Sequence, residues 1–565
     1  MGHLPVELMW KVCFNLCMHC HSPDALPHAD TTDERQAKAA LARLARSSKY
    51  MHAVAQPYIF HYYATGNMIR LVVSEKTGCA IDLTDPYGPY ADEFGKGCRP
   101  SHDNDHLPLF LRSIIRRPEL AAQVEALQLV ASPNVDDFNA PDMEVISGTA
   151  QGATAMSRTS EAFQMITKAS VDIGLIDTNV FHPEFRGRHS VTSGVGPPNH
   201  ESQTDSIHHT LEQLVILLCP NVNTLVYGYP LEKRSIITAD TLQVDRRQRE
   251  QFWSLALSSG QHLTSLKRIA LLSHSRTQHV SDGQIMLCSM PNVETFYAAH
   301  LTYPGPATET IGLSLWVNPM PNVRKLVAVD MSPDDLAFLV DSCLDLWELE
   351  YTHHGYFGRP TSITGCELLK PITAVRGTLR RLVLVAMAEG DPRGDRVTEH
   401  AIPSLRMFKR LEELAISQIH VPHAGNISSI TPGISLAKFL PRSIKKLHIL
   451  YLSDASFMAA LEGLARDAPS KVPKLRCIRI SYLDHEDPDY DSNDRLPVAA
   501  GQYERVRESL AAVSISMTWD RLGYRMPREV AMPAAGGSAC SGTYLSTPYC
   551  FWEASHSLQS GGVLS

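Results

Sequence analysis

One short apolar pattern recurs along most of this 565-residue chain and restricts the folds that it can adopt. From Leu266 onward its copies start 23 to 33 residues apart, about the length of one supersecondary unit. A unit of that size cannot bury its own apolar face, so neighbouring units must stack and share a core. The sequence therefore predicts an α/β solenoid. The pattern is apolar-x-x-apolar-x-apolar, and after a divergent copy at Val124 it starts at Val222, Leu266, Val293, Val323, Leu346, Leu379, Leu411, Ile444 and Leu475.

Each copy is predicted to form a strand, with helices between several of the strands. Proline stands just before some copies, as in Met290-Pro291-Asn292-Val293, and marks the change to a strand because it cannot continue a helix. Ser332 as an N-cap, Pro333 at the first helical position and the aspartates that follow predict a helix start. The sequence also predicts helices over 161–170, 210–218 and 454–465.

We expect the strands to pair in parallel, with the fourth and sixth residues of each copy in the core and helices or loops on the convex side. The predicted core residues are Leu225, Ile269, Phe296, Leu326, Leu349, Leu382, Leu414, Leu447 and Ile478, together with Leu271, Leu384, Ile416, Ile449 and Ile480.

The third and fifth residues of each copy should point away from this core, because side chains alternate along a strand. They would line the concave face, which solenoids use for binding. Apolar residues at these positions, including Val226, Ala270, Val327, Val383 and Ala415, predict exposed apolar area between charges. Mixed charge favours a protein partner, although the same residues could simply be solvated. The candidate binding residues are Arg268, Tyr297, Lys325, Glu348, Glu350, Arg381, Glu413, Lys446, His448 and Arg479.

The N-terminal region predicts a separate helical domain. Leu8, Val12 and Leu16 recur every fourth residue, and Pro5 suits the first turn of a helix. A second helix is expected over 33–46. The order Leu4-Pro5-x-Glu7-Leu8, then a helical stripe, then Leu41-x-x-Leu44-x-x-x-Ser48-Lys49 resembles an F-box.

Taken together, the chain resembles fungal F-box proteins of the leucine-rich-repeat type. The resemblance divides it into an F-box-like helical domain (1–63), a connecting region with the first divergent repeat (64–205), an irregular leucine-rich-repeat solenoid (206–520) and a poorly ordered tail (521–565). The repeats depart from the family pattern, because the Asn or Cys that normally follows each repeat strand is absent. No asparagine ladder is expected at that position. The F-box departs from the family pattern in a longer connection between its first two helices (19–32) and in Met51 and His52, where an aromatic residue is usual.

The resemblance implies a function. The F-box would dock a SKP-type adaptor and thereby a cullin-type ubiquitin ligase, while the repeats hold a protein substrate near the ligase's ubiquitin-charged enzyme. Such a receptor is not an enzyme and needs no cofactor. An alternative is a leucine-rich-repeat interaction scaffold with no link to ubiquitin, since fold alone does not fix function. The implied adaptor-binding residues are Leu4, Pro5, Leu8, Val12, Leu16, Leu41 and Leu44.

Composition favours an intracellular protein. Net charge is −8 with Lys and Arg scattered, which argues against a nucleic-acid partner. The chain has no apolar run of about 18 residues and no signal-peptide pattern, so we expect no membrane insertion and a cytoplasmic or nuclear location. The 12 cysteines are dispersed, which favours free thiols over disulfides. No Gly-x-Ser-x-Gly, P-loop or His-Glu-x-x-His motif indicates catalysis.

Cysteines and histidines crowd together near the end of the first predicted helix. Cys17-x-x-Cys20 is half of a zinc signature, but no second Cys-x-x-Cys or His pair follows at finger spacing. Cysteine also suits the buried side of a helix, where it behaves as a small apolar residue. We therefore expect no metal site, and a zinc-dependent regulatory module is the least favoured of the three functions. The group consists of Cys13, Cys17, His19, Cys20, His21 and His28.

Overall fold

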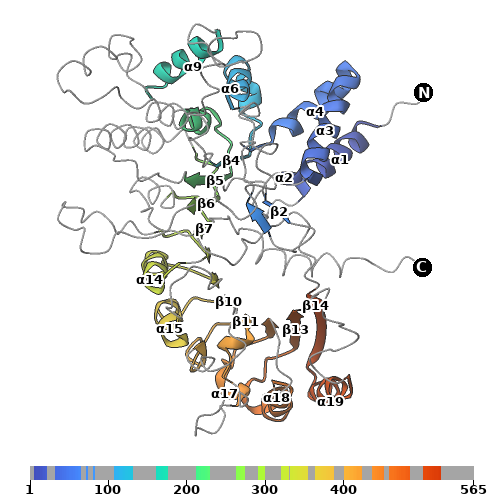
Figure 1. Cartoon of the computed structure of the whole chain (residues 1–565), viewed down its shortest axis with the longest axis vertical. Coiled ribbons are helices and arrows are strands. Elements are labelled where there is room, and N and C mark those ends of the chain that lie inside the picture. Colours follow the sequence, from blue (N-terminus) through green and yellow to red (C-terminus); the bar gives the residue numbers. More distant parts are fainter. Residues whose placement is uncertain are drawn as a thin grey trace, which may run out of the picture. The chain divides into compact units, whose positions relative to one another are not determined.

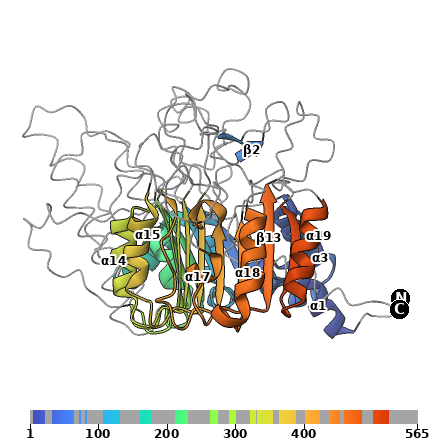
Figure 2. The same ribbon diagram turned by 90° about the horizontal axis from the view of Figure 1, so that it is seen from below.

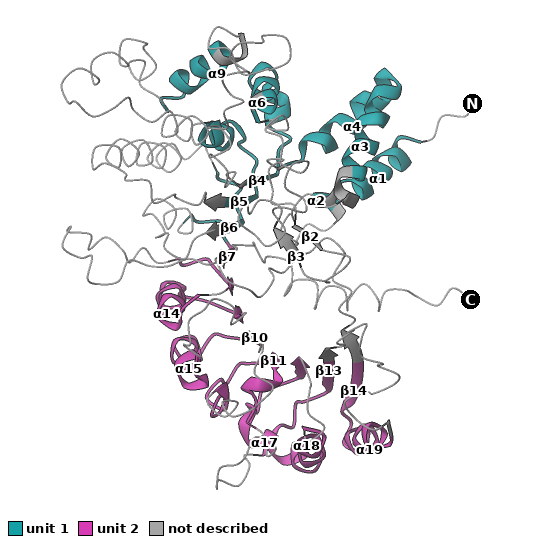
Figure 3. Ribbon diagram, viewed as in Figure 1, with its two compact units in different colours: residues 1–72, 81–293, 540–543 teal, residues 73–80, 294–539, 544–565 magenta. Residues whose placement is uncertain are grey.

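The computed structural model describes residues 5–21, 32–64, 71–73, 80–82, 107–130, 161–175, 211–229, 263–273, 290–299, 320–329, 331–353, 363–386, 400–422, 435–450, 457–483 and 500–522. The chain divides into two compact units (Figure 3). The first comprises residues 1–72, 81–293 and 540–543, and the second comprises residues 73–80, 294–539 and 544–565. The predicted tail (521–565) begins within a strand that ends at Leu522, which corrects its start, and its residues 523–565 lie outside the described residues, as do the segment 131–160 and Leu4.

Helices form the N-terminal part of the first unit. They are α1 (Val6–Leu16), α2 (Met18–His21), α3 (Thr32–Ser47) and α4 (Lys49–Phe60). The predicted helix over 33–46 thus forms as part of α3. Ser48 caps α4, since its hydroxyl accepts a hydrogen bond from the Met51 N–H. The core of these helices consists of Met9, Cys13, Leu41, Ala45, Val54 and Ala55.

The first unit continues into parallel strands. β1 (Tyr62–Ala64) pairs with β4 (Ala126–Val130), β4 with β5 (Thr224–Tyr229), and β5 with β6 (Arg268–Ser273). Residues 211–218 are helical, as predicted. Further elements are α6 (Leu107–Arg116), α7 (Pro118–Ala121), α9 (Glu161–Asp172), which covers the predicted helix over 161–170, and the strand pair β2 (Leu71–Val73) and β3 (Ala80–Asp82).

The second unit repeats the strand-and-helix arrangement. Its strands lie in chain order, and every pairing described between them is parallel. Its α-helices lie along the outer side of the arc of strands (Figures 1 and 2). The strands are β7 (Thr295–Ala299), β8 (Lys325–Val329), β9 (Glu348–His353), β10 (Arg381–Ala386), β11 (Glu413–Ser417), β12 (Lys446–Leu450), β13 (Cys477–Leu483) and β14 (Ser516–Leu522). The helices are α14 (Pro333–Ser342), α15 (Gly365–Thr373), η4 (Gln418–His420), α17 (Leu436–Phe439), α18 (Phe457–Lys471) and α19 (Ala500–Ala511).

The predicted α/β architecture with parallel strands is confirmed. All the predicted core residues at the fourth and sixth positions are at most 1% exposed. The helix predicted from Ser332 and Pro333 is α14, in which the Ser332 hydroxyl accepts a hydrogen bond from the Asp335 N–H. The strands β1 and β14 were not predicted; β1 precedes the ten predicted copies and β14 follows them.

A backbone hydrogen-bond series fixes the start of each strand. The Glu412 carbonyl accepts hydrogen bonds from the N–H groups of Lys445 and Lys446, 2.7 and 3.0 Å away, and equivalent carbonyls do the same from β4 to β6 in the first unit and from β7 to β13 in the second. The series begins at the His61 carbonyl, which accepts from Glu125 and Ala126. We call it the carbonyl series. Within each unit it gives successive repeats the same register at the start of the strand.

Side chains reinforce the strand starts. The Asn221 and Asn292 amides donate hydrogen bonds to the carbonyls of Ala122 and Thr264 in the preceding repeats, 2.7 and 2.5 Å away. Asparagines therefore link some repeats before the strand, although the usual position after it has none. In the second unit the Trp347 ring lies between two guanidinium groups, whose central carbons, from Arg324 and Arg380, are each 4.6 Å from the ring centroid.

No helix in the described part of the chain is long and apolar enough to cross a membrane.

Candidate functional site

Helix α1 exposes four large apolar side chains. Its buried stripe consists of Met9 and Cys13, whereas Leu8 and Val12, two of the predicted adaptor-binding residues, are exposed. At about 100° per residue, Leu8 and Val12 lie on one side of this stripe and the aromatic residues on the other. The exposed fractions are 50% for Leu8, 51% for Trp10, 45% for Val12 and 45% for Phe14. We call Leu8 and Val12 the aliphatic flank and Trp10 and Phe14 the aromatic flank.

The other predicted adaptor-binding residues divide between surface and core. Pro5 is exposed at the N-cap of α1. Leu16 and Leu44 are partly buried and pack against the helical core. Leu41 is 1% exposed, so its side chain packs between helices and is not on a surface that a partner could touch. Leu41 lies on the side of α3 that faces the other helices, where removing its side chain from water stabilises their packing.

The helical domain is tied to the first strands by several contacts. The Tyr62 hydroxyl donates a buried hydrogen bond to the Gln128 side-chain oxygen, and Lys38 Nζ of α3 lies 4.1 Å from the centroid of the Tyr62 ring. Phe110 of α6 stacks on Tyr63, with 4.0 Å between ring centroids. These contacts hold α3 and α6 against β1. Because α1 shares a core with α3 and α4, its position relative to β1 is set as well.

The concave charges predicted to bind a substrate are paired with one another. Arg381 Nη1 lies 3.2 Å from Glu348 Oε2, and Lys325 Nζ lies 3.9 Å from the same oxygen. On the next two strands Lys446 Nζ lies 2.6 Å from Glu413 Oε1. Each pair joins residues that the strand register places opposite each other. Arg268 is at the corresponding position on β6, whereas Arg479 of β13 is opposite His448, two residues further along its strand; both arginines are partly buried.

The fifth position is buried in every repeat except the one that starts at Leu475, where Arg479 is partly buried, and this corrects the prediction of an exposed apolar face. Tyr297, Glu350 and His448 are 1%, 4% and 2% exposed, so their side chains are not available to a substrate in this structure. Parallel strands lie about 4.8 Å apart, so side chains on the inner side of a curved sheet crowd one another. Val383, Val385, Ala415 and Leu450 form a small apolar cluster there. The predicted apolar residues Val226, Ala270, Val327, Val383 and Ala415 are at most 5% exposed.

Two buried histidines of the second unit have lowered pKa values. Burial lowers the pKa of His448 to about 3, and the positive charge of Arg479 adds to the effect. Its Nε2 lies 2.7 Å from the Ser481 hydroxyl. Burial also lowers the pKa of His420 to about 4, although its Nδ1–H donates to the His400 carbonyl at 2.9 Å. Both side chains are therefore neutral in the folded protein near pH 7.

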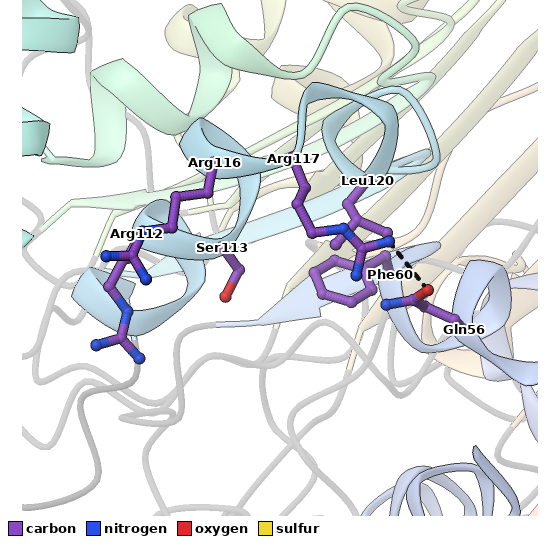
Figure 4. Close-up of a pocket in the computed structure, with 7 residues that line it drawn as sticks. All are labelled: Gln56, Phe60, Arg112, Ser113, Arg116, Arg117 and Leu120. Atoms are coloured by element: carbon purple, nitrogen blue, oxygen red, sulfur yellow. Dashed lines mark hydrogen bonds between the residues drawn. The ribbon is translucent and has the colours of Figure 1, made fainter. Parts of the chain in front are cut away.

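A hollow of about 280 Å³ lies between α4 and the helices α6 and α7 (Figure 4). Arg117 closes one side through a 3.2 Å hydrogen bond from Nη2 to Gln56 Oε1, and its Nε donates to Glu119 Oε1 at 2.7 Å. The arginines give the hollow a basic character that the sequence analysis did not predict. Its lining residues are Gln56, Phe60, Arg112, Ser113, Arg116, Arg117 and Leu120.

The Cys/His-rich segment folds into a compact ligand set with one distant residue. The side-chain ligand atoms of Cys17, His19, Cys20 and His61 all lie within 4.8 Å of one another. Cys17 is the C-cap residue of α1, with an extended backbone, and His61 is the C-cap residue of α4. His19 and Cys20 belong to α2. The hydrogen bond to Cys20 lowers the pKa of Cys17, while the same contact raises that of Cys20.

Only part of the sequence-predicted cysteine and histidine group takes part in this set. Cys13 is fully buried in the helical core, His28 lies outside the described residues, and the His21 side chain is not described. His61 was missed because it lies 41 residues beyond Cys20 and carries no motif of its own. No protein-family model matches the chain, and no similar sequence is found among curated proteins.

Proposed function

We propose that this chain is a non-catalytic substrate receptor of a cullin-type ubiquitin ligase. Its N-terminal helices would dock a SKP-type adaptor, and the repeats would hold a protein substrate. The observation that carries the proposal is the exposure of four large apolar side chains on α1, a helix of the domain that resembles an F-box. Apolar area of this kind on a small helical domain is typical of a protein-binding surface.

The exposed area can supply a useful share of the binding energy. Complete burial of a leucine or valine side chain contributes about 1.5–3 kcal/mol. Leu8 and Val12 are 50% and 45% exposed, so each can gain roughly half of that amount. The aliphatic flank would thus contribute about 2 kcal/mol, or a roughly 30-fold change in Kd.

The repeats offer charges that a substrate could use. The ion pairs between Lys325, Glu348 and Arg381, and between Glu413 and Lys446, involve side chains 20–44% exposed. Ion pairs at such partly exposed sites contribute only about 0–1 kcal/mol. A substrate of complementary mixed charge could therefore exchange partners with them at little cost. The buried residues Tyr297, Glu350 and His448 would support this face through packing.

The test is binding of the purified full-length chain to a purified SKP-type adaptor. Leu8→Glu combined with Val12→Glu removes the aliphatic flank while keeping a good helix former. Because both side chains are exposed, the thermal unfolding midpoint should stay close to that of the unmodified chain. Adaptor binding should weaken at least 30-fold, or about 2 kcal/mol.

The matched control is Lys11→Glu combined with Asn15→Glu, which places glutamates on the exposed polar side of the same helix. This variant should bind the adaptor as the unmodified chain does. Replacing Trp10 and Phe14 with Glu tests the aromatic flank separately. If neither flank variant weakens adaptor binding, or if the unmodified chain does not bind, the receptor proposal is wrong.

A further inference from the structure

We propose that Cys17, His19, Cys20 and His61 bind one zinc ion, which joins the helical domain to the first repeat. This inference is independent of the proposed function, because it rests on four side chains that make no part of the exposed face of α1. Two cysteines and two histidines are a usual ligand set of structural zinc sites. The segment contributes three ligands within four residues, and the end of α4 contributes the fourth.

The distances between ligand atoms suit a tetrahedral ion. Zn–S bonds of about 2.3 Å and Zn–N bonds of about 2.0–2.1 Å place sulfur and nitrogen ligands about 3.5 Å apart around a tetrahedral ion. Cys20 Sγ lies 3.2 Å from His61 Nδ1 and 3.9 Å from His19 Nδ1. The two histidine rings stand nearly perpendicular, at 86°, with their centroids 6.0 Å apart. Small side-chain adjustments would therefore bring all four ligands to bonding distance.

The outer surroundings also resemble those of a metal site. His19 turns Nδ1 toward the cluster, while its Nε2 lies 3.4 Å from Glu125 Oε2. A metal-bound histidine commonly donates its second ring N–H to a carboxylate, which fixes the ring and strengthens the ligand. Glu125 is itself held, since its Oε2 accepts from the Asn223 amide at 3.3 Å. Glu125, at the start of the first repeat, thus holds the His19 ring in the orientation that a metal ligand needs.

The donor set favours zinc over other common ions. Magnesium and calcium prefer oxygen ligands, and copper(II) and nickel(II) prefer square-planar or tetragonal sites. Cys17 is 5% exposed, and a buried thiolate is unfavourable without a compensating cation. Two thiolates and two neutral imidazoles would neutralise a divalent ion.

The position of His61 gives the ion a structural role. Its side chain belongs to the ligand set, while its carbonyl starts the carbonyl series by accepting hydrogen bonds from Glu125 and Ala126 at 2.9 Å. The other ligands follow α1 directly. Zinc would therefore hold the end of α1 against the end of α4 and the beginning of the repeat sheet.

The first experiment measures metal in the full-length protein. Protein purified in the presence of zinc and then dialysed should retain about one zinc ion per chain by mass spectrometry of the metal. Replacement with cobalt(II) should give the visible bands of tetrahedral coordination and a thiolate charge-transfer band in the near ultraviolet. Protein that retains no zinc and shows no such bands, or whose Cys17 and Cys20 are joined in a disulfide, would overturn the proposal.

A pair of variants separates metal binding from folding. His61→Ala should lose zinc under chelator conditions that the unmodified chain withstands, whereas His61→Cys supplies another ligand and should retain it with a stronger charge-transfer band. Glu125→Gln should weaken zinc binding roughly 10- to 100-fold. The exposed residues Cys366 and His52 provide controls, since Cys366→Ser and His52→Asn should leave the zinc content unchanged. Equal zinc retention in His61→Ala and the unmodified chain would also refute the site.

Discussion

His448 should make the stability of the second unit depend on pH. In the folded protein its pKa is about 3, because the side chain is buried between strands and faces the positive charge of Arg479. In the unfolded chain its pKa is about 6.5. Between these values the unfolded chain binds a proton that the folded chain does not bind, so the free energy of unfolding falls as pH falls.

The magnitude follows from the unfolded pKa alone, as long as the pH stays well above 3. One such histidine lowers the free energy of unfolding by about 0.1 kcal/mol at pH 7.5 and by about 1.4 kcal/mol at pH 5.5. The difference between the two pH values is therefore about 1.4 kcal/mol. His420 adds a similar amount, because its folded pKa is about 4.

The assay is urea unfolding at pH 7.5 and 5.5, followed by fluorescence and circular dichroism. Other groups titrate in this range, so the informative quantity is the difference between the unmodified chain and His448→Gln. Glutamine can still hydrogen-bond the Ser481 hydroxyl, which now lies 2.7 Å from His448 Nε2. The variant should lose about 1.4 kcal/mol less than the unmodified chain on acidification. Equal losses in the two proteins would refute the reasoning.

Two further predictions concern packing in the second unit. A methyl group on Gly365 would overlap the carbonyl oxygen of Ala401, so Gly365→Ala should lower the free energy of unfolding by about 1–3 kcal/mol, whereas Gly463→Ala, in open space within α18, should raise it by about 0.5–1 kcal/mol. Chemical denaturation of both variants checks this, and equal effects would contradict it. Trp347→Leu should cost about 1–2 kcal/mol because the ring lies between two guanidinium groups. A double-mutant cycle with Arg380→Met measures one of these contacts, and a coupling energy near zero would show that the stacking adds nothing.

Periodicity predicted the repeat fold well, because the same six-residue pattern is buried on the same side of every strand. Leu225, Leu349 and Leu447 are each at most 1% exposed at their predicted positions. The strands at the two ends were missed for different reasons. β1 has only three residues, too few to show the pattern. In β14, Met517 pairs with Ile478, so the pattern would start three residues before Met517, where the polar Ser514 stands in place of an apolar residue.

The site was less predictable from sequence than the sheet. Helix α1 is apolar around most of its circumference, so spacing alone could not decide whether Leu8 or Met9 faces the core. The concave face was expected to be open, but packing between neighbouring strands buries Tyr297 and His448. Metal ligands are the hardest case, because His61 approaches Cys20 only through the packing of α4 against α1.

The carbonyl series also bears on how a chain of this type can change its length. In the second unit, repeats of 23 to 33 residues start their strands at the same register, so their difference in length falls between the end of one strand and the start of the next. An insertion or deletion there leaves the paired backbone untouched. Such a protein can acquire new surface loops, and with them new recognition properties, while the scaffold that displays them is inherited unchanged.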